Sequence, residues 1–165
     1  MSRKVDYVKF WNDYIDYCVD KGSTIFTLED KISIAKDIEH SKTKTISQLT
    51  IDLNANIKSG HVNIYPIRVE NYINKRTPGL NQMIFDVLKR HKIKIENQLN
   101  ELGWNIIFHE PQGNVKTRKI YIPGVDLCYD GKNDLILYDF YHRASEDLYR
   151  VLRPIYDSMS FLKTH

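Results

Sequence analysis

Hydrophobic and polar positions follow the clearest pattern over residues 62–104, where they predict a strand, a helix and a second strand. Apolar and polar side chains alternate between residues 67 and 73, as in a half-buried strand. A helix is predicted over residues 80–102, because apolar side chains recur there at helical steps. The residues of this stripe are Leu80, Ile84, Val87, Leu88, Ile95, Leu99 and Leu102. Gly103 then allows the helix to end, and Trp104 opens the next strand.

Two helices are predicted before this unit. Residues 7–20 carry an aromatic and apolar stripe at helical spacing, which we interpret as core packing rather than as a surface for stacking bases. The stripe consists of Phe10, Trp11, Tyr14, Ile15 and Cys18. Thr27 is followed by acidic residues, which is typical of a helix start, and the short helix that follows is expected to end near His40.

The remaining strands are predicted to form two hairpins. After a polar loop at residues 40–44, residues 46–53 alternate as a strand and return through a longer loop into the strand that begins at Val62. Pro66 has no backbone N–H, and the alternation changes phase beside it, so we predict a bulge there. A second hairpin is predicted from residues 104–108 and 115–122, with the turn Pro111-Gln112-Gly113-Asn114 between them.

A last helix is predicted from Asp134 toward Lys163, and Pro154 is expected to kink it or divide it in two. Together these elements predict an α+β fold, in which two hairpins form one antiparallel sheet of about four strands and the helices pack on one face. The chain of 165 residues is expected to form a single domain over residues 1–165.

The composition indicates an ordinary globular protein, with 42% hydrophobic and 27% charged residues. No apolar run approaches the ~18 residues that span a bilayer. The charged N-terminus lacks the apolar centre of a signal peptide, so we predict a cytoplasmic protein. Cys18 and Cys128 show neither metal-type nor disulfide spacing and are expected to be small buried residues.

Charge is distributed unevenly along the chain, although the formal net charge is only +3. Basic residues dominate between residues 68 and 94: Arg68, Lys75, Arg76, Lys89, Arg90, Lys92 and Lys94. Acidic residues dominate between residues 126 and 147: Asp126, Asp130, Asp134, Asp139, Glu146 and Asp147. This asymmetry suits docking to a charged partner, or it reflects two ordinary solvated helix faces.

Several motifs of the central unit resemble a domain family of unassigned biochemical function, found C-terminal to nuclease domains in restriction-endonuclease-like prokaryotic proteins. The matching residues are Arg68-Val69-Glu70-x-Tyr72-Ile73, Asn81-x3-Phe85-x2-Leu88, Lys92-x2-Ile95-Glu96, Leu102-Gly103-Trp104 and Arg118-x-Ile120, with weaker echoes at Phe10-Trp11 and Arg153-Pro154. The resemblance spans most of the chain except residues 24–56. It implies prokaryotic or viral origin, a setting in nucleic-acid defence, and no catalytic residues of its own.

The nuclease chemistry itself requires carboxylates and a lysine on paired strands around a divalent cation. Only Glu29-Asp30-Lys31 and Asp130-Gly131-Lys132 have the acid-x-lysine spacing, and Asp126 precedes the second by too few residues for two strands. No phosphate-binding loop, dinucleotide fingerprint or nucleophile elbow is present, and the six histidines show no ligand spacing. We therefore predict no catalytic residues, no metal site and no cofactor.

The candidate binding residues are the basic side chains Arg90, Lys94, Lys89, Lys92, Arg68 and Arg118. On one continuous helix, Glu96 would neutralise Lys92, which leaves the edge formed by Arg90 and Lys94 as the expected contact surface. Arg68, Glu70, Glu96 and Arg118 form either a recognition site for an anion or, as we favour, a structural ion-pair network on the sheet.

The sequence therefore predicts a non-enzymatic binding module that works in prokaryotic nucleic-acid defence or counter-defence. Because the domain begins at its own methionine without the nuclease, it is expected to occlude or regulate a partner. One form is a phage-type inhibitor of a CRISPR or restriction effector, and another is a nucleic-acid-binding accessory of such an effector, in either case without a membrane and with a homodimer possible. The alternative is a minimal divalent-metal-dependent nuclease that uses Asp126 and Asp130.

Overall fold

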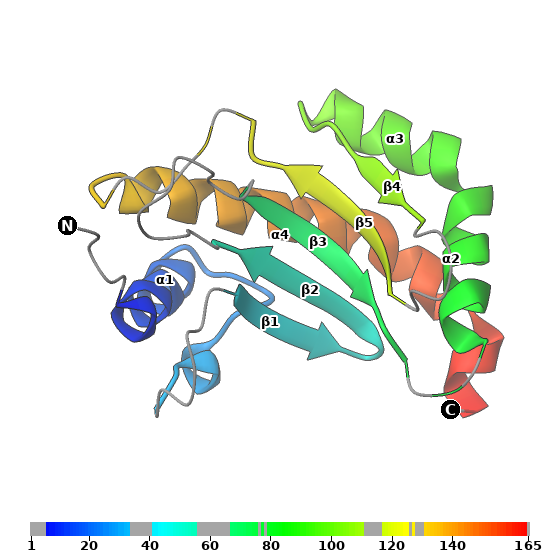
Figure 1. Ribbon diagram of the computed structural model, residues 1–165, viewed down its shortest axis with the longest axis horizontal. Helices are drawn as coiled ribbons and strands as arrows, with labels where there is room; N and C mark the ends of the chain where they lie inside the picture. Colours follow the sequence, from blue (N-terminus) through cyan, green and yellow to red (C-terminus); the bar gives the residue numbers. More distant parts are fainter. Residues whose placement is uncertain are drawn as a thin grey trace.

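A computed structural model describes residues 6–33, 41–55, 67–75, 77, 79–110, 117–125, 127 and 131–164. These residues form one antiparallel sheet with helices packed against it (Figure 1). The elements are α1 (Tyr7–Asp20), the 3₁₀ helix η1 (Leu28–Asp30), β1 (Ser41–Ile46), β2 (Leu49–Asn54), β3 (Arg68–Ile73), α2 (Leu80–Arg90), α3 (Lys92–Glu101), β4 (Ile107–His109), β5 (Arg118–Pro123), α4 (Asp134–Asp157) and the 3₁₀ helix η2 (Ser160–Thr164).

The five strands lie in the order β1-β2-β3-β5-β4, and every pair is antiparallel. Because side chains alternate along a strand, one face of the sheet is apolar and packs against the helices. In Figure 1, α4 runs behind the sheet along this face. The apolar side chains of the face include Leu49, Ile51, Leu53, Val69, Ile73, Ile120 and Ile122, all buried. The predicted α+β class is confirmed, with five strands where about four were expected.

The aromatic stripe of α1 belongs to the core. Trp11 and Tyr14 are fully buried. The Trp11 ring lies 5.4 Å from the Tyr141 ring of α4, measured between centroids, and the Phe10 ring lies 5.2 Å from that of Tyr138. Packed aromatic pairs of this kind add to the stabilisation that burial provides. The interpretation of this stripe as core rather than as a base-stacking surface is confirmed.

The β1–β2 hairpin is the strand pair that the sequence pattern did not predict. The residues expected to form a loop, from Ser41 onward, instead pair with β2. Its turn consists of Ser47 and Gln48, both with positive φ (45° and 78°), a conformation usually taken by Gly, Asn or Asp. Arg153 donates hydrogen bonds to the carbonyls of Ile46 and Ser47, at 2.8 and 3.1 Å, which holds this turn against α4.

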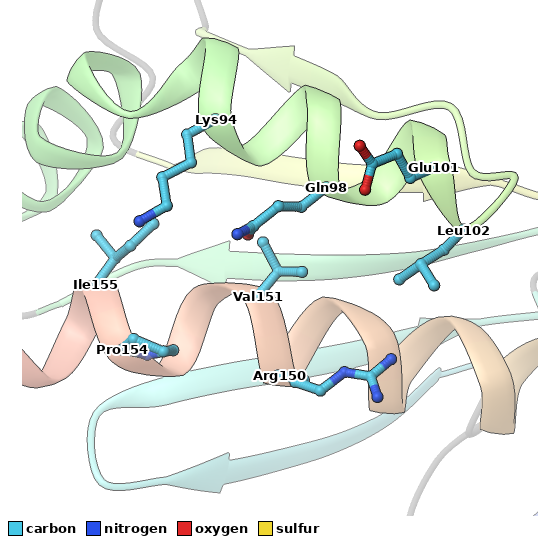
Figure 2. Close-up of a pocket in the computed structure, with 8 residues that line it drawn as sticks. All are labelled: Lys94, Gln98, Glu101, Leu102, Arg150, Val151, Pro154 and Ile155. Atoms are coloured by element: carbon cyan, nitrogen blue, oxygen red, sulfur yellow. The ribbon is translucent and has the colours of Figure 1, made fainter.

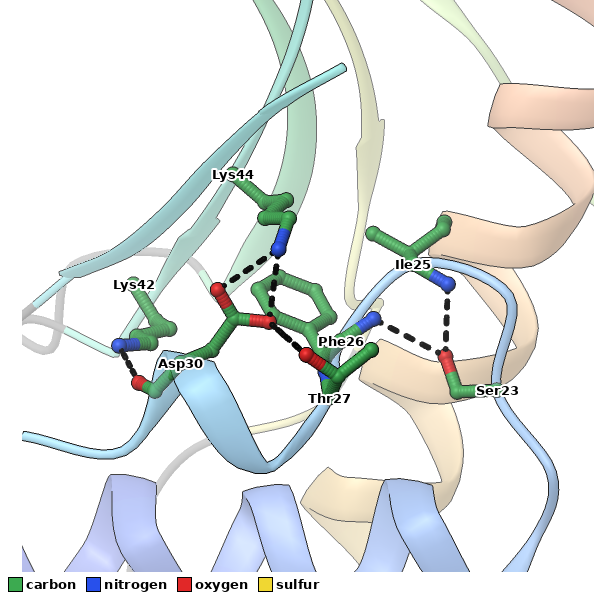
Figure 3. Close-up of polar contacts among 7 residues, drawn as sticks. All are labelled: Ser23, Ile25, Phe26, Thr27, Asp30, Lys42 and Lys44. Atoms are coloured by element: carbon green, nitrogen blue, oxygen red, sulfur yellow. Dashed lines mark hydrogen bonds and ion pairs between the residues drawn. The ribbon is translucent and has the colours of Figure 1, made fainter.

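The helix expected after Thr27 is only one turn long. The predicted helix start is present and forms a capping box, in which the Thr27 N–H donates to the Asp30 carboxylate at 2.7 Å. Lys31 is already extended, however, with ψ at 141°. Asp30 instead binds the Lys44 ammonium of β1 at 2.9 and 3.0 Å, and its carbonyl accepts a hydrogen bond from Lys42 (Figure 3). The rest of this predicted helix, residues 34–40, lies outside the described residues.

The long helix predicted over residues 80–102 is in fact two helices. His91 leaves helical geometry, with φ −95° and ψ 11°, and α2 and α3 meet there at a sharp bend (Figure 1). At the far end, Gly103 adopts φ +90°, and the Trp104 N–H donates to the Leu99 carbonyl at 2.9 Å. This hydrogen bond is part of a Schellman motif, so the predicted stop at Gly103 is confirmed.

Burial along this unit follows the prediction except at one residue. Phe85, Leu88 and Ile95 are buried together as expected. Trp104 is only half-buried, and its indole N–H donates to the Asp147 carboxylate at 2.7 Å. It lies before β4 rather than at the start of that strand.

The last helix is not divided at Pro154. α4 continues through Pro154 to Asp157, and the chain then forms η2. The second hairpin, β4 with β5, pairs as predicted. No described helix is long and apolar enough to cross a membrane. The bulge predicted at Pro66 lies outside the described residues.

Candidate binding surface

The bend between α2 and α3 gathers the four basic side chains predicted from the sequence on one corner. We call residues 89–94 the basic elbow. Lys89 and Arg90 end α2, whereas Lys92 and Lys94 begin α3. These four basic residues therefore do not lie on one helix. The prediction that their side chains are spaced by about 100° per residue around a single helix axis is wrong, because His91 interrupts the helix.

Two of these four charges are neutralised locally. Lys89 pairs with Glu110 at 3.2 Å, and Lys92 pairs with Glu96 at 3.6 Å, as predicted. Among the described residues, Arg90 donates only to the backbone carbonyl of Asp86, at 3.4 Å. Neither Arg90 nor Lys94 forms an ion pair with a described residue. Arg90 and Lys94 are therefore the two uncompensated charges of the elbow, in agreement with the sequence argument but for a different geometric reason.

The elbow also exposes an apolar side chain. Ile93 lies between Lys92 and Lys94 and is 76% exposed. Cations in the first turn of a helix oppose its dipole, so Lys92 and Lys94 do not stabilise α3 through their position. A partner that covers Ile93 and supplies negative charge to Lys94 would relieve both unfavourable features.

A groove between α3 and α4 continues from the elbow (Figure 2). It has a volume of about 390 Å³ and is lined by Lys94, Gln98, Glu101, Leu102, Arg150, Val151, Pro154 and Ile155. Lys94 extends over Ile155 at one end, and Leu102 closes the other end. Val151 and Ile155 form an apolar floor, and Leu102 remains 46% exposed. The groove could not be predicted from the sequence, because its two walls are separated by about fifty residues.

The ion-pair network predicted on the sheet for Arg68, Glu70, Glu96 and Arg118 forms only in part. The Arg68 Nε donates to the Glu70 carboxylate at 2.7 Å, and Lys119 lies 3.7 Å from the other carboxylate oxygen. Arg118 is not in this network, because its side chain emerges on the opposite face of β5, where it donates to Gln82 of α2. Glu96 is also elsewhere, paired with Lys92. A cross-strand ion-pair network is therefore present, with Lys119 in the place expected for Arg118.

A second carboxylate faces Glu70 across the strands. Asp52 of β2 lies directly opposite Glu70 in the register. Burial raises the pKa of Asp52 to about 6, and the nearby Glu70 carboxylate adds to this rise, whereas the hydrogen bond from Thr43 at 2.6 Å opposes it. Asp52 thus changes charge close to neutral pH.

Metal ligands and reactive thiols can be assessed only among the described residues. No cluster of three or more His, Cys, Asp or Glu side chains among them is arranged to hold a metal ion. Burial raises the pKa of the Cys18 thiol to about 12, which makes it a poor nucleophile at neutral pH. Asp126, Asp130 and Cys128 lie outside the described residues.

Comparisons of this chain with models of known protein families, with curated proteins and with solved structures found no match. The resemblance noted in the sequence therefore remains a prediction.

Proposed function

We propose that this protein is a non-catalytic binding module that docks onto a protein partner through the basic elbow and the α3–α4 groove. The observation that carries the proposal is the position of Arg90 and Lys94. Neither forms an ion pair with a described residue, Lys94 directly follows the exposed Ile93, and Lys94 also lines the groove. The partner's matching surface is acidic around an apolar centre.

The composition of the groove favours a protein ligand over nucleic acid. Its floor is apolar, and its rim carries charges, as in protein interfaces with a hydrophobic core and a polar edge. Trp104, two residues after the lining residue Leu102, lies under the Arg143 guanidinium at 5.2 Å, and Trp and Arg are enriched among residues that dominate binding energy. Glu101 would repel a phosphate chain along the same wall.

The biological setting rests on the resemblance to domains that accompany restriction-type nucleases. We propose that the partner is an effector of prokaryotic nucleic-acid defence, such as a CRISPR or restriction nuclease, and that this protein inhibits or regulates it. The alternative of a minimal nuclease would be favoured by cleavage of DNA or RNA in Mg²⁺ or Mn²⁺ that disappears in Asp126→Ala and Asp130→Ala.

The test is a titration of purified candidate effectors with the wild type and with the double variant Arg90→Glu/Lys94→Glu. Affinity should fall about tenfold to a hundredfold in the double variant, because reversed charges replace attraction by repulsion at the interface. Lys9→Glu/Lys21→Glu is a matched control, since it makes the same change in net charge on exposed positions of α1 and at its C-terminal end. This control should bind as the wild type does.

The proposal would be wrong if the Arg90→Glu/Lys94→Glu variant, shown to be folded, bound every effector as tightly as the wild type. The basic elbow would then be an ordinary solvated surface. Loss of binding in both double variants would point instead to net charge, rather than to a local contact surface.

A further inference from the structure

The face of the sheet that points away from α4 is polar and aromatic. It is turned toward the reader in Figure 1, and no described helix crosses it. The strand registers place its side chains in rows across the sheet. One row is Thr43, Asp52, Glu70, Tyr121 and Ile107, and the neighbouring row includes Thr45, Thr50, Tyr72, Lys119 and His109.

Two tyrosines occupy diagonal positions at the centre of this face. Tyr121 of β5 lies opposite Glu70, and Tyr72 of β3 lies opposite Lys119. Such diagonal positions are about 7–8 Å apart, a separation that neighbouring bases of an extended single strand can match. Both residues are half-buried, so part of each side chain remains accessible to solvent.

Each ring is accompanied by a cation. The Arg68 guanidinium lies 5.7 Å from the centre of the Tyr121 ring, and the Lys119 ammonium lies 5.7 Å from that of Tyr72. Arg68 uses its Nε for Glu70, and its two Nη nitrogens donate to no described residue. The Lys119 ammonium is 3.7 Å from Glu70, which is a loose contact. Both cations therefore retain donors for an additional anion.

We propose that this face binds single-stranded nucleic acid, with bases stacked on Tyr72 and Tyr121 and phosphates bound by Arg68 and Lys119. An incoming base displaces the cation from the ring, and the displaced charge meets the adjacent phosphate. Stacking on aromatic side chains is available to every base, but only where the bases are not already stacked within a duplex. Glu70 is buried and contacts both cations, at 2.7 Å from Arg68 and 3.7 Å from Lys119, so it holds them close to the rings.

This site is separate from the groove of the proposed function, which lies on the helical layer between α3 and α4. It uses none of the groove residues and a ligand of a different class. The two proposals can therefore fail independently.

The test measures fluorescence anisotropy of a labelled oligothymidylate of about 10 nucleotides with the wild type, Tyr72→Ala, Tyr121→Ala and the double variant. Each single variant should weaken binding about five- to a hundredfold, while the phenylalanine variants, which keep the rings, should retain most of the affinity. Tyr149→Ala is the matched control, because Tyr149 also lies under an arginine, Arg153 at 5.9 Å, but on α4. A duplex of the same length should bind more weakly.

A second measurement avoids any change to the protein. An oligonucleotide carrying 5-iodouracil should crosslink under ultraviolet light to Tyr72 or Tyr121 of the wild type. The inference is overturned if the wild type does not bind the single strand at low salt, if the folded double variant binds as well as the wild type, or if crosslinks map only to other residues.

Discussion

Replacing Phe85 with alanine is expected to lower the free energy of unfolding by about 3–5 kcal/mol, a large part of the stability of a typical domain. Phe85 is 1% exposed on α2, and its ring packs edge-on against Phe108 of β4, with 6.3 Å between centroids. α2 lies over β3 and β5 at this point. Alanine would leave a cavity that the sheet, held by its hydrogen bonds, cannot close.

Urea denaturation of the wild type and the variant measures this loss. Met83→Ala is the control, because Met83 lies on the same helix but is 45% exposed, so it should change stability far less. An unchanged unfolding midpoint for Phe85→Ala would contradict the packing of α2 described above.

Asp52→Asn is expected to stabilise the protein at pH 7, by up to about 3 kcal/mol. Folding raises the pKa of Asp52 from 3.8 to about 6, so between these values the folded state binds more protons than the unfolded state. The stability that this group contributes is therefore present at low pH and is lost as the pH rises through about 6. Asparagine carries no charge at any of these pH values, and its amide can donate to Glu70 throughout.

The difference in unfolding free energy between Asp52→Asn and the wild type should accordingly grow from about pH 4 to about pH 6 and then level off. Asp20→Asn, at the exposed end of α1, should show no such growth. A difference that stayed constant with pH would mean that burial does not raise the pKa of Asp52 in the folded protein.

The elements with long, regular patterns were predictable, and those fixed by local backbone geometry were not. The stripes of α1 and α4 mark buried faces, because each continues over several turns. The β1–β2 hairpin escaped prediction because its turn residues, Ser47 and Gln48, carry no turn signal and rely on Arg153 from α4. The break at His91 also lacks a glycine or proline to mark it.

In the candidate binding surface, too, some features were predictable from the sequence and others were not. The sequence identified Arg90 and Lys94, since no acidic residue lies between them, whereas Lys92 has Glu96 four residues further on. The prediction that Arg118 lies beside Glu70 was wrong. Neighbouring residues of a strand point to opposite faces of the sheet, so Lys119 contacts Glu70, whereas Arg118 lies on the other face, where it donates to Gln82. The groove was not predictable, because it depends on how α3 packs against α4.

If the basic elbow and the α3–α4 groove form the docking surface, a bound effector should protect their backbone amides from solvent. Amide hydrogen exchange, measured on the free protein and on its complex with the effector, detects this protection. We expect slower exchange on binding in residues 89–102 and 150–155, with little change in α1. Protection confined to α1 or to β1 and β2, with exchange in the elbow and groove unchanged, would contradict it.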